Sequence, residues 1–117
     1  MTRADAHAFV QEEMMGFRAA RAVGDSAGAW RALERVHIVS QPYALLHLAS
    51  HWSMLRLAVG TRDPGEVAGQ LFRLLLVPLG AISGRLPIGN TGRSNVSAFR
   101  VMSIPPDLLA KINGERS

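Results

Sequence analysis

The chain has 117 residues, of which 48% are hydrophobic and 19% are charged, a balance that is normal for a globular protein and excludes a disordered one. This length predicts a single domain, 1–117, or one subunit of an oligomer. The chain contains no cysteine, which excludes disulfides and thiolate-bound zinc or iron–sulfur sites.

Charge and hydropathy exclude further classes of protein. The net charge is +4, and 12 of the 13 basic residues are arginines scattered over all segments. Because they form no basic block and lack a recognition helix or stacking aromatic residues, a nucleic-acid binder is not favoured. The start, MTRADAHAF, has no signal-peptide core, and the most apolar run, 71–82, is interrupted by Arg73 and Pro78. We therefore expect a cytoplasmic protein without a membrane span.

The first predicted helix spans residues 4–23. Phe9 and Phe17 belong to its apolar face, and Gly24 is a natural stop. Glu13 falls on the same side of the helix, and a carboxylate there needs a partner because burying a bare charge is expensive. That partner is either an arginine at the edge of the core or a metal ion.

Two further helices are predicted on either side of Pro42. Asp25 is the expected N-cap of the second helix, which extends to about residue 40. Proline cannot lie inside a helix without removing a hydrogen bond, so Pro42 is expected to mark the turn and the first residue of the third helix, which ends at residue 59. In this third helix His47 and His51 share one narrow stripe and Arg56 lies opposite, which predicts that both histidines face inward.

The fourth helix has a strong start signal. Asp63 is the expected N-cap, Pro64 the first helical residue, and Glu66 the residue that completes a capping box. Glu66, Gln70 and Arg73 share one face of a helix that is otherwise rich in leucine, valine and phenylalanine. This polar stripe is either a solvated face or a wall of hydrogen-bonding groups beside a metal.

These signals predict an all-α fold, an antiparallel four-helix bundle made of two helical hairpins over residues 4–83. An irregular arm rich in glycine, asparagine and proline follows at 84–106, and a short helix at 107–114. The similar helix ends before the second and fourth helices also fit the stacked hairpins of a repeat protein. Such proteins usually need three or more units, so a closed bundle is the simpler prediction.

The arm contains GRLPIGNTGRSNVSAF at 84–99, a segment of turn-forming residues without helical period. The backbone amides of Gly89, Gly92 and Ser94, together with Arg85 and Arg93, would form an anion-binding nest. The alternative is an ordered arm laid across the bundle. A P-loop is excluded because no Gly-Lys-Ser/Thr follows.

The pattern that carries chemistry is Glu34-x-x-His37 followed by His47-x-x-x-His51. Residues three or four apart on a helix are neighbours on its surface, about 5–6 Å between Cβ atoms. If the two helices fold back on each other about Pro42, all four side chains converge. Imidazole and carboxylate are ligands of divalent transition metals, here zinc, iron, manganese or copper.

Other features limit this prediction. The chain has one Glu-x-x-His and no HExxH, so we expect a single ion and no thermolysin-type mechanism. Glu13 is a candidate fifth ligand, because pairing the first two helices places it opposite Glu34 and His37. The structural alternative is a set of core histidines hydrogen-bonded to Glu34 and to backbone carbonyls. His7, near the N-terminus, is expected to be a solvated surface residue.

Several short motifs together resemble a known family. LERVHIVSQ, HLASHWSML, GRLPIGNTGRSNVS and the Pro-Pro-Asp-Leu tail are similar to a small bacterial domain-of-unknown-function family, the one numbered 3703. The resemblance covers almost the whole chain and implies a single-domain protein without an assigned reaction. Its pattern falls on the turn 89–92 and on Glu34, His37, Gln41, His47, His51, Glu66, Gln70 and Arg73. Val36 departs from the pattern, where a smaller residue is expected.

A metal held by three or four side chains can keep a position for water, whose pKa the metal lowers. The sequence therefore favours a metal-dependent enzyme acting on a small molecule. The residues predicted to lie around the metal or substrate are Gln41, Glu66, Gln70, Arg73, Asn90 and Arg93. The alternative is a non-catalytic metal-binding, metal-sensing or protein-interaction module with a structural Glu/His cluster. Expected partners are a metal ion or small molecule, and a second copy in a homodimer.

Overall fold

The regular structure of this protein is entirely helical in the part that the computed structural model describes, residues 1–83, 90–94 and 100–114. The helices are α1 (Arg3–Ala22), α2 (Ser26–Ser40), α3 (Ala44–Gly60), α4 (Pro64–Ser83) and α5 (Pro106–Ile112). The prediction of an all-α fold is confirmed. Among these described helices, none is both long and apolar enough to cross a membrane.

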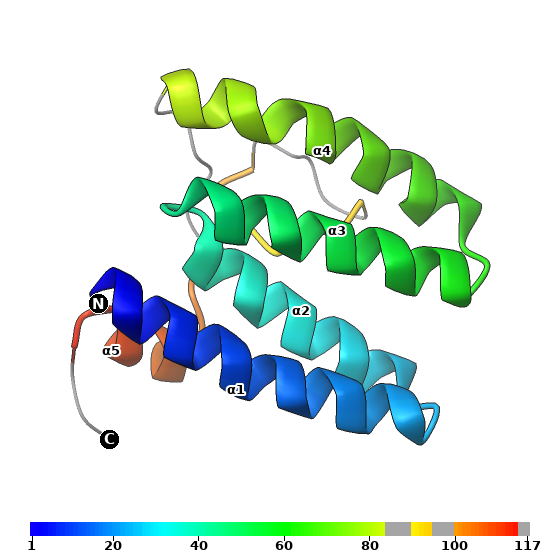
Figure 1. The fold of residues 1–117 in the computed structure, drawn as a ribbon, viewed down its shortest axis with the longest axis horizontal. Coiled ribbons are helices and arrows are strands. Elements are labelled where there is room, and N and C mark those ends of the chain that lie inside the picture. Colours follow the sequence, from blue (N-terminus) through cyan, green and yellow to red (C-terminus); the bar gives the residue numbers. More distant parts are fainter. Residues whose placement is uncertain (84–89, 95–99, 115–117) are drawn as a thin grey trace.

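Consecutive helices run antiparallel and pack side by side, α1 against α2, α2 against α3 and α3 against α4 (Figure 1). The two predicted helical hairpins, α1–α2 and α3–α4, are thus confirmed. In Figure 1 the four helices follow one another in chain order, so that α1 and α4 lie on opposite sides of the molecule. The contact between α2 and α3 joins the hairpins and positions the site described below.

Local capping signals set most helix ends. The Asp25 carboxylate accepts a hydrogen bond from the Gly28 amide (2.9 Å), and Asp63 accepts one from the Glu66 amide (3.1 Å), so both predicted N-caps are confirmed. The position of Pro42 is a correction. Tyr43 is the N-cap of α3 with extended backbone angles, φ −118° and ψ 100°, so Pro42 belongs to the turn and the helix begins at Ala44.

The core consists of two apolar clusters. The larger joins α1, α2 and α3 and contains Phe17, Ala29, Trp30, Ala32, Leu33, Met54, Leu57 and Ala58. The smaller lies where α1 and α2 meet the C-terminal helix and contains Ala6, Phe9, Ile38, Val39 and Leu108. Burial of these side chains, each worth about 1.5–3 kcal/mol when large and apolar, holds the first hairpin and α5 together.

One arginine connects three helices at the edge of the smaller cluster. Arg35 of α2 donates from Nε to Glu13 of α1 (3.0 Å) and from Nη2 to Asp107 of α5 (2.8 Å). The partner of the Glu13 carboxylate is therefore an arginine, which is one of the two partners that the sequence predicts for it. The short helix predicted at the C-terminus therefore packs back onto the start of the chain.

Candidate metal centre

Three histidines meet between α2 and α3. The Nε2 atom of His37 lies 3.0 Å from that of His47 and 3.1 Å from that of His51, and the latter two are 3.2 Å apart. All three side chains are buried, with 2%, 6% and 2% of their surface exposed. The predicted convergence of these histidines about the turn at Pro42 is therefore present in the structure.

The helical positions explain why the three rings meet. His47 and His51 are one turn apart on α3, on the stripe that continues with the fully buried Met54 and Ala58, while Arg56 is exposed on the other side. His37 lies near the end of α2, on the side that faces α3 after the turn. Two adjacent helices joined by a short turn thus supply all three imidazoles.

Hydrogen bonds on the outer side of two rings determine where their protons are. Nδ1 of His37 donates to the backbone carbonyl of Asn90, and Nδ1 of His51 donates to Oε1 of Gln70, both at 2.7 Å. The Gln70 amide is oriented by its own donations to Glu66 Oε1 (2.9 Å) and to the Gly92 carbonyl (2.8 Å), so its oxygen must face His51. A neutral imidazole carries one N–H. Both rings therefore present an unprotonated Nε2 to the centre of the cluster.

Burial keeps the three imidazoles neutral. It lowers the pKa of His47 and of His51 to about 4, and it also lowers the pKa of His37, with additional repulsion from the neighbouring histidines for His37 and His47. Near neutral pH all three rings are in the form that binds metals, because a ligand nitrogen must be unprotonated.

The triangle of Nε2 atoms has the dimensions of a metal site. Zinc–imidazole bonds are about 2.0–2.1 Å long, so two imidazole nitrogens on one ion lie about 3.3 Å apart in a tetrahedral site and about 2.9 Å apart in an octahedral one. The observed separations of 3.0–3.2 Å fall between these values. His37, His47 and His51 would therefore be able to hold one ion together through their Nε2 atoms.

The two carboxylates predicted as ligands have other partners. Glu34 lies 3.7 Å from Nη1 of Arg93, and Glu13 pairs with Arg35. Burial raises the pKa of Glu34 despite the nearby charge of Arg93. Within the described residues, the group whose ligand atoms all lie within 4.8 Å of one another consists of His37, His47 and His51. The structure therefore groups the histidines and places both glutamates beside arginines.

The polar face of α4 points inward. Glu66, Gln70 and Arg73 are buried, with 5%, 0% and 7% exposed, so the interpretation as a solvated face is wrong. The capping box is also corrected. The Asp63 amide bonds to the Ala58 carbonyl (3.0 Å), while the Glu66 carboxylate accepts the Ser94 amide with both oxygens at 3.1 Å. A buried carboxylate requires such donors, and they come from the arm.

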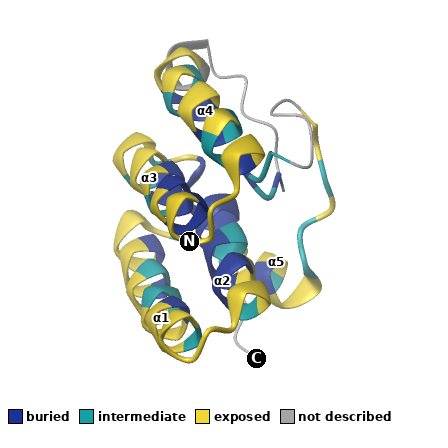
Figure 2. Ribbon diagram, turned by 90° about the vertical axis from the view of Figure 1, so that its right-hand side faces the viewer, coloured by how far each residue is buried: buried dark blue, intermediate teal, exposed yellow. Residues whose placement is uncertain are grey.

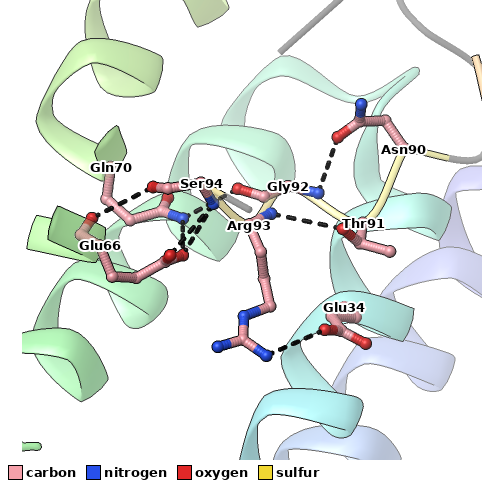
Figure 3. Close-up of polar contacts among 8 residues, drawn as sticks. All are labelled: Glu34, Glu66, Gln70, Asn90, Thr91, Gly92, Arg93 and Ser94. Atoms are coloured by element: carbon pink, nitrogen blue, oxygen red, sulfur yellow. Dashed lines mark hydrogen bonds and ion pairs between the residues drawn. The ribbon is translucent and has the colours of Figure 1, made fainter. Parts of the chain in front are cut away.

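Residues 90–94, called the clasp here, connect the inner face of α4 to α2 (Figure 3). The clasp bonds to α4 through Gly92 and Ser94, and to α2 through the Asn90 carbonyl on His37. Arg93 also lies over the ring of Trp30 at 4.3 Å, in addition to its contact with Glu34, a favourable cation–π arrangement.

Two of the backbone amides predicted to bind an anion, those of Gly92 and Ser94, are hydrogen-bonded to side chains of the protein itself. The Ser94 amide binds the Glu66 carboxylate, and the Gly92 amide donates to Asn90 Oδ1 (2.9 Å). Asn90 in turn donates to the Arg100 carbonyl (2.8 Å). These contacts fit the alternative of an ordered arm over the bundle. Gly89 and Arg85, which belonged to the same prediction, lie outside the described residues.

Two of the predicted site residues remain to be placed. Gln41 is buried at the C-cap of α2, next to the turn. Arg73 donates from Nη1 to the Gly69 carbonyl at 3.3 Å, and its positive charge contributes to the lowered pKa of His37 and His51. His7 is exposed on α1, as predicted. Ser94 was not predicted as the partner of Glu66, because a backbone amide carries no residue-specific signal.

The close approach of the clasp to His37 gives a testable prediction. A Cβ added to Gly92 would lie 2.6 Å from His37 Cδ2, whereas one added to Gly24 would meet nothing within 4 Å, and both glycines have positive φ, +85° and +75°. Gly92→Ala is therefore expected to lower metal affinity about tenfold or more and to destabilise the fold more than Gly24→Ala. Calorimetric metal titration and thermal unfolding of both variants check this, since the backbone cost of positive φ is common to them. Equal effects of the two substitutions would contradict the packing of Gly92 on His37.

Comparison with known proteins identifies the family. The family model described as protein of unknown function (DUF3703) matches residues 4–112, so the chain belongs to this family. The resemblance noted in the sequence is confirmed. Neither the curated proteins nor the solved structures contain a match.

Proposed function

We propose that this DUF3703 protein binds one divalent transition-metal ion through the Nε2 atoms of His37, His47 and His51. The observation that carries the proposal is the convergence of three buried, neutral imidazoles, two of which have their only proton on the opposite nitrogen. Such nitrogens repel one another through their lone pairs, and they cannot form a hydrogen bond together. A cation bound by the three Nε2 atoms would replace this repulsion with attraction.

The surroundings support metal binding as well. Metal-bound histidines usually donate their second nitrogen to a carbonyl or carboxylate, which fixes the ring and increases its basicity. Asn90 and Gln70 supply such acceptors here. The all-imidazole set suits zinc, copper or iron, and manganese less well because manganese prefers oxygen ligands.

Three protein ligands also bear on what the ion would do. Structural zinc sites usually have four protein ligands, whereas catalytic sites have three and keep a position for water or substrate. This difference favours a metal-dependent enzyme acting on a small molecule, with Arg73 near the cluster as a source of positive charge. The clasp contact with His37 favours the second candidate, a metal-binding or metal-sensing module, because occupancy of the cluster would then affect the position of residues 90–94.

The test is metal analysis of untagged protein purified without chelator, followed by removal of metal and titration with Zn²⁺ and Co²⁺. We expect one equivalent per chain and the visible absorption of tetrahedral or five-coordinate Co²⁺. A change of that absorption on addition of azide would support an open position and the enzyme; an unchanged spectrum would support the metal-binding module. Less than about a tenth of an equivalent after reconstitution would contradict metal binding.

A further inference from the structure

The fourth helix has its polar residues inside and its large apolar residues outside. Its inner face carries Glu66, Gln70 and Arg73, while the outer face carries apolar side chains at one-turn intervals. The exposed fractions on the outer face are 51% for Leu71, 53% for Phe72, 74% for Leu75 and 61% for Leu79. A surface helix normally shows the reverse arrangement. Figure 2 shows α4 at one end of the molecule with much of its surface exposed.

The helix cannot relieve this exposure by rotating about its axis. Rotation would break the bonds of Gln70 to His51 and to Gly92, and those of Glu66 to Ser94. The outer face is defined here as Leu71, Phe72, Leu75 and Leu79. It therefore stays exposed to water unless another molecule covers it.

The outer face carries no charge that would select a charged partner. Between residues 67 and 83 the sequence has a single charged residue, Arg73, and it is buried. Helices that lie on membranes combine an apolar face with exposed lysine or arginine on the polar face, and α4 has its polar face inside the protein. An uncharged apolar surface fits another uncharged apolar surface, and a second copy of the chain supplies an identical one.

We propose that α4 is the interface of a two-fold symmetric homodimer, with Leu75 at the symmetry axis. In an antiparallel pairing about that point, Leu75 contacts the partner's Leu75 and Leu71 contacts the partner's Leu79. The spacing of four residues on each side of Leu75 makes the outer face self-complementary, as an interface with identical patches requires.

A groove beside the outer face extends the contact. It has a volume of about 460 Å³ and is lined by five apolar residues, Val59, Pro64, Val67, Ala68 and Leu71, together with Arg62 and Asp63. The groove lies at the N-terminal end of α4, where the antiparallel pairing places the C-terminal half of the partner's helix. With Val59, which is 59% exposed, the outer face presents on the order of 500 Å² of apolar surface per copy. Two copies would then bury on the order of 1,000 Å², which is enough for a specific but modest interface.

Analytical ultracentrifugation of the full chain and two variants tests the proposal. We expect the natural sequence to dimerise at micromolar concentration and Leu75→Arg to weaken dimerisation by about 100-fold or more, since it brings two like charges together at the axis. The control is Met15→Arg, which changes an apolar residue of α1 that is 65% exposed on the opposite side of the molecule. It is expected to leave the dimer intact. Helix content by circular dichroism establishes that both variants fold.

A cross-linking experiment tests the symmetry axis itself. Because the chain has no cysteine, Leu75→Cys provides one thiol per copy, and diamide oxidation should yield a covalent dimer. Met15→Cys should remain uncross-linked at the same concentration. A natural sequence that stays monomeric at 10 to 100 times the expected dissociation constant, or a dimer that Leu75→Arg leaves unchanged, would overturn the proposal. So would a monomer that sediments with phosphatidylcholine vesicles, because α4 would then be a lipid-binding face.

Discussion

A His47→Ala/His51→Ala double variant is expected to lose stoichiometric metal, with an affinity for Zn²⁺ at least about 1,000-fold lower than that of the natural protein. The physical reason is that one imidazole, His37, would remain of the three that converge between α2 and α3. Metal that binds only the folded state stabilises it by about 4 kcal/mol at a free concentration 1,000 times the dissociation constant. This stabilisation should also disappear in the variant.

The measurement is elemental analysis combined with thermal unfolding at several Zn²⁺ concentrations. The matched control is His7→Ala, because His7 is exposed on α1 and lies outside the histidine cluster. The control should keep one equivalent of metal and the full shift in unfolding temperature. A double variant that still binds one equivalent with unchanged affinity would refute the three-histidine site.

The metal-free protein is expected to lose stability as the pH falls from about 6.5 to about 4. Unfolded histidines titrate near 6.5, whereas burial lowers the pKa of His47 and His51 in the folded state to about 4. Between these values the unfolded chain takes up protons that the folded protein cannot accept, so the equilibrium shifts toward unfolding. Well above pH 6.5 the three buried rings are neutral in both states and the effect vanishes. The loss is on the order of 3 kcal/mol for each histidine.

Urea unfolding of the metal-free protein between pH 7.5 and 4.5 measures this dependence. The slope of unfolding free energy against pH should be positive in that window, and clearly smaller for the His47→Ala/His51→Ala variant. Glu34, whose raised pKa has the opposite effect near the acidic limit, is common to both proteins. An equal slope in the two proteins would show that the buried histidines are not the groups that titrate.

Local signals determined much of the fold. Asp25 and Asp63 each cap a helix through a residue three positions ahead, and Pro42 separates α2 from α3 because proline lacks an amide hydrogen. The helix order, the two hairpins and the inward stripe of His47 and His51 follow from such signals and from helical periodicity. The boundary at Pro42 was misplaced by two residues because the backbone angles of Tyr43 depend on the turn as a whole.

Local sequence signals did not determine which groups pair with the carboxylates of Glu13 and Glu34. Glu34 has the spacing of a metal ligand and Glu13 was predicted to lie opposite it, yet Glu13 pairs with Arg35 and Glu34 with Arg93, which are 22 and 59 residues away in the sequence. A carboxylate binds whichever donor the fold brings nearest, and spacing within one helix carries no information about side chains from other segments.

The sequence by itself determined that this protein is helical, because capping and periodicity depend on residues within one or two helical turns. It also determined that three histidines meet beside the α2–α3 turn, because they are at most 14 residues apart on two helices that a single short turn connects. Only the tertiary structure decided that the polar face of α4 is buried. The local sequence predicts that Glu66 is a capping residue. Its carboxylate instead accepts a hydrogen bond from the backbone amide of Ser94, 28 residues later. Apart from proline, every residue has the same backbone N–H group, so the contacts of these groups become visible only when the chain is folded. Burying those bonds turns the leucines of α4 outward, which is why this helix inverts the usual arrangement.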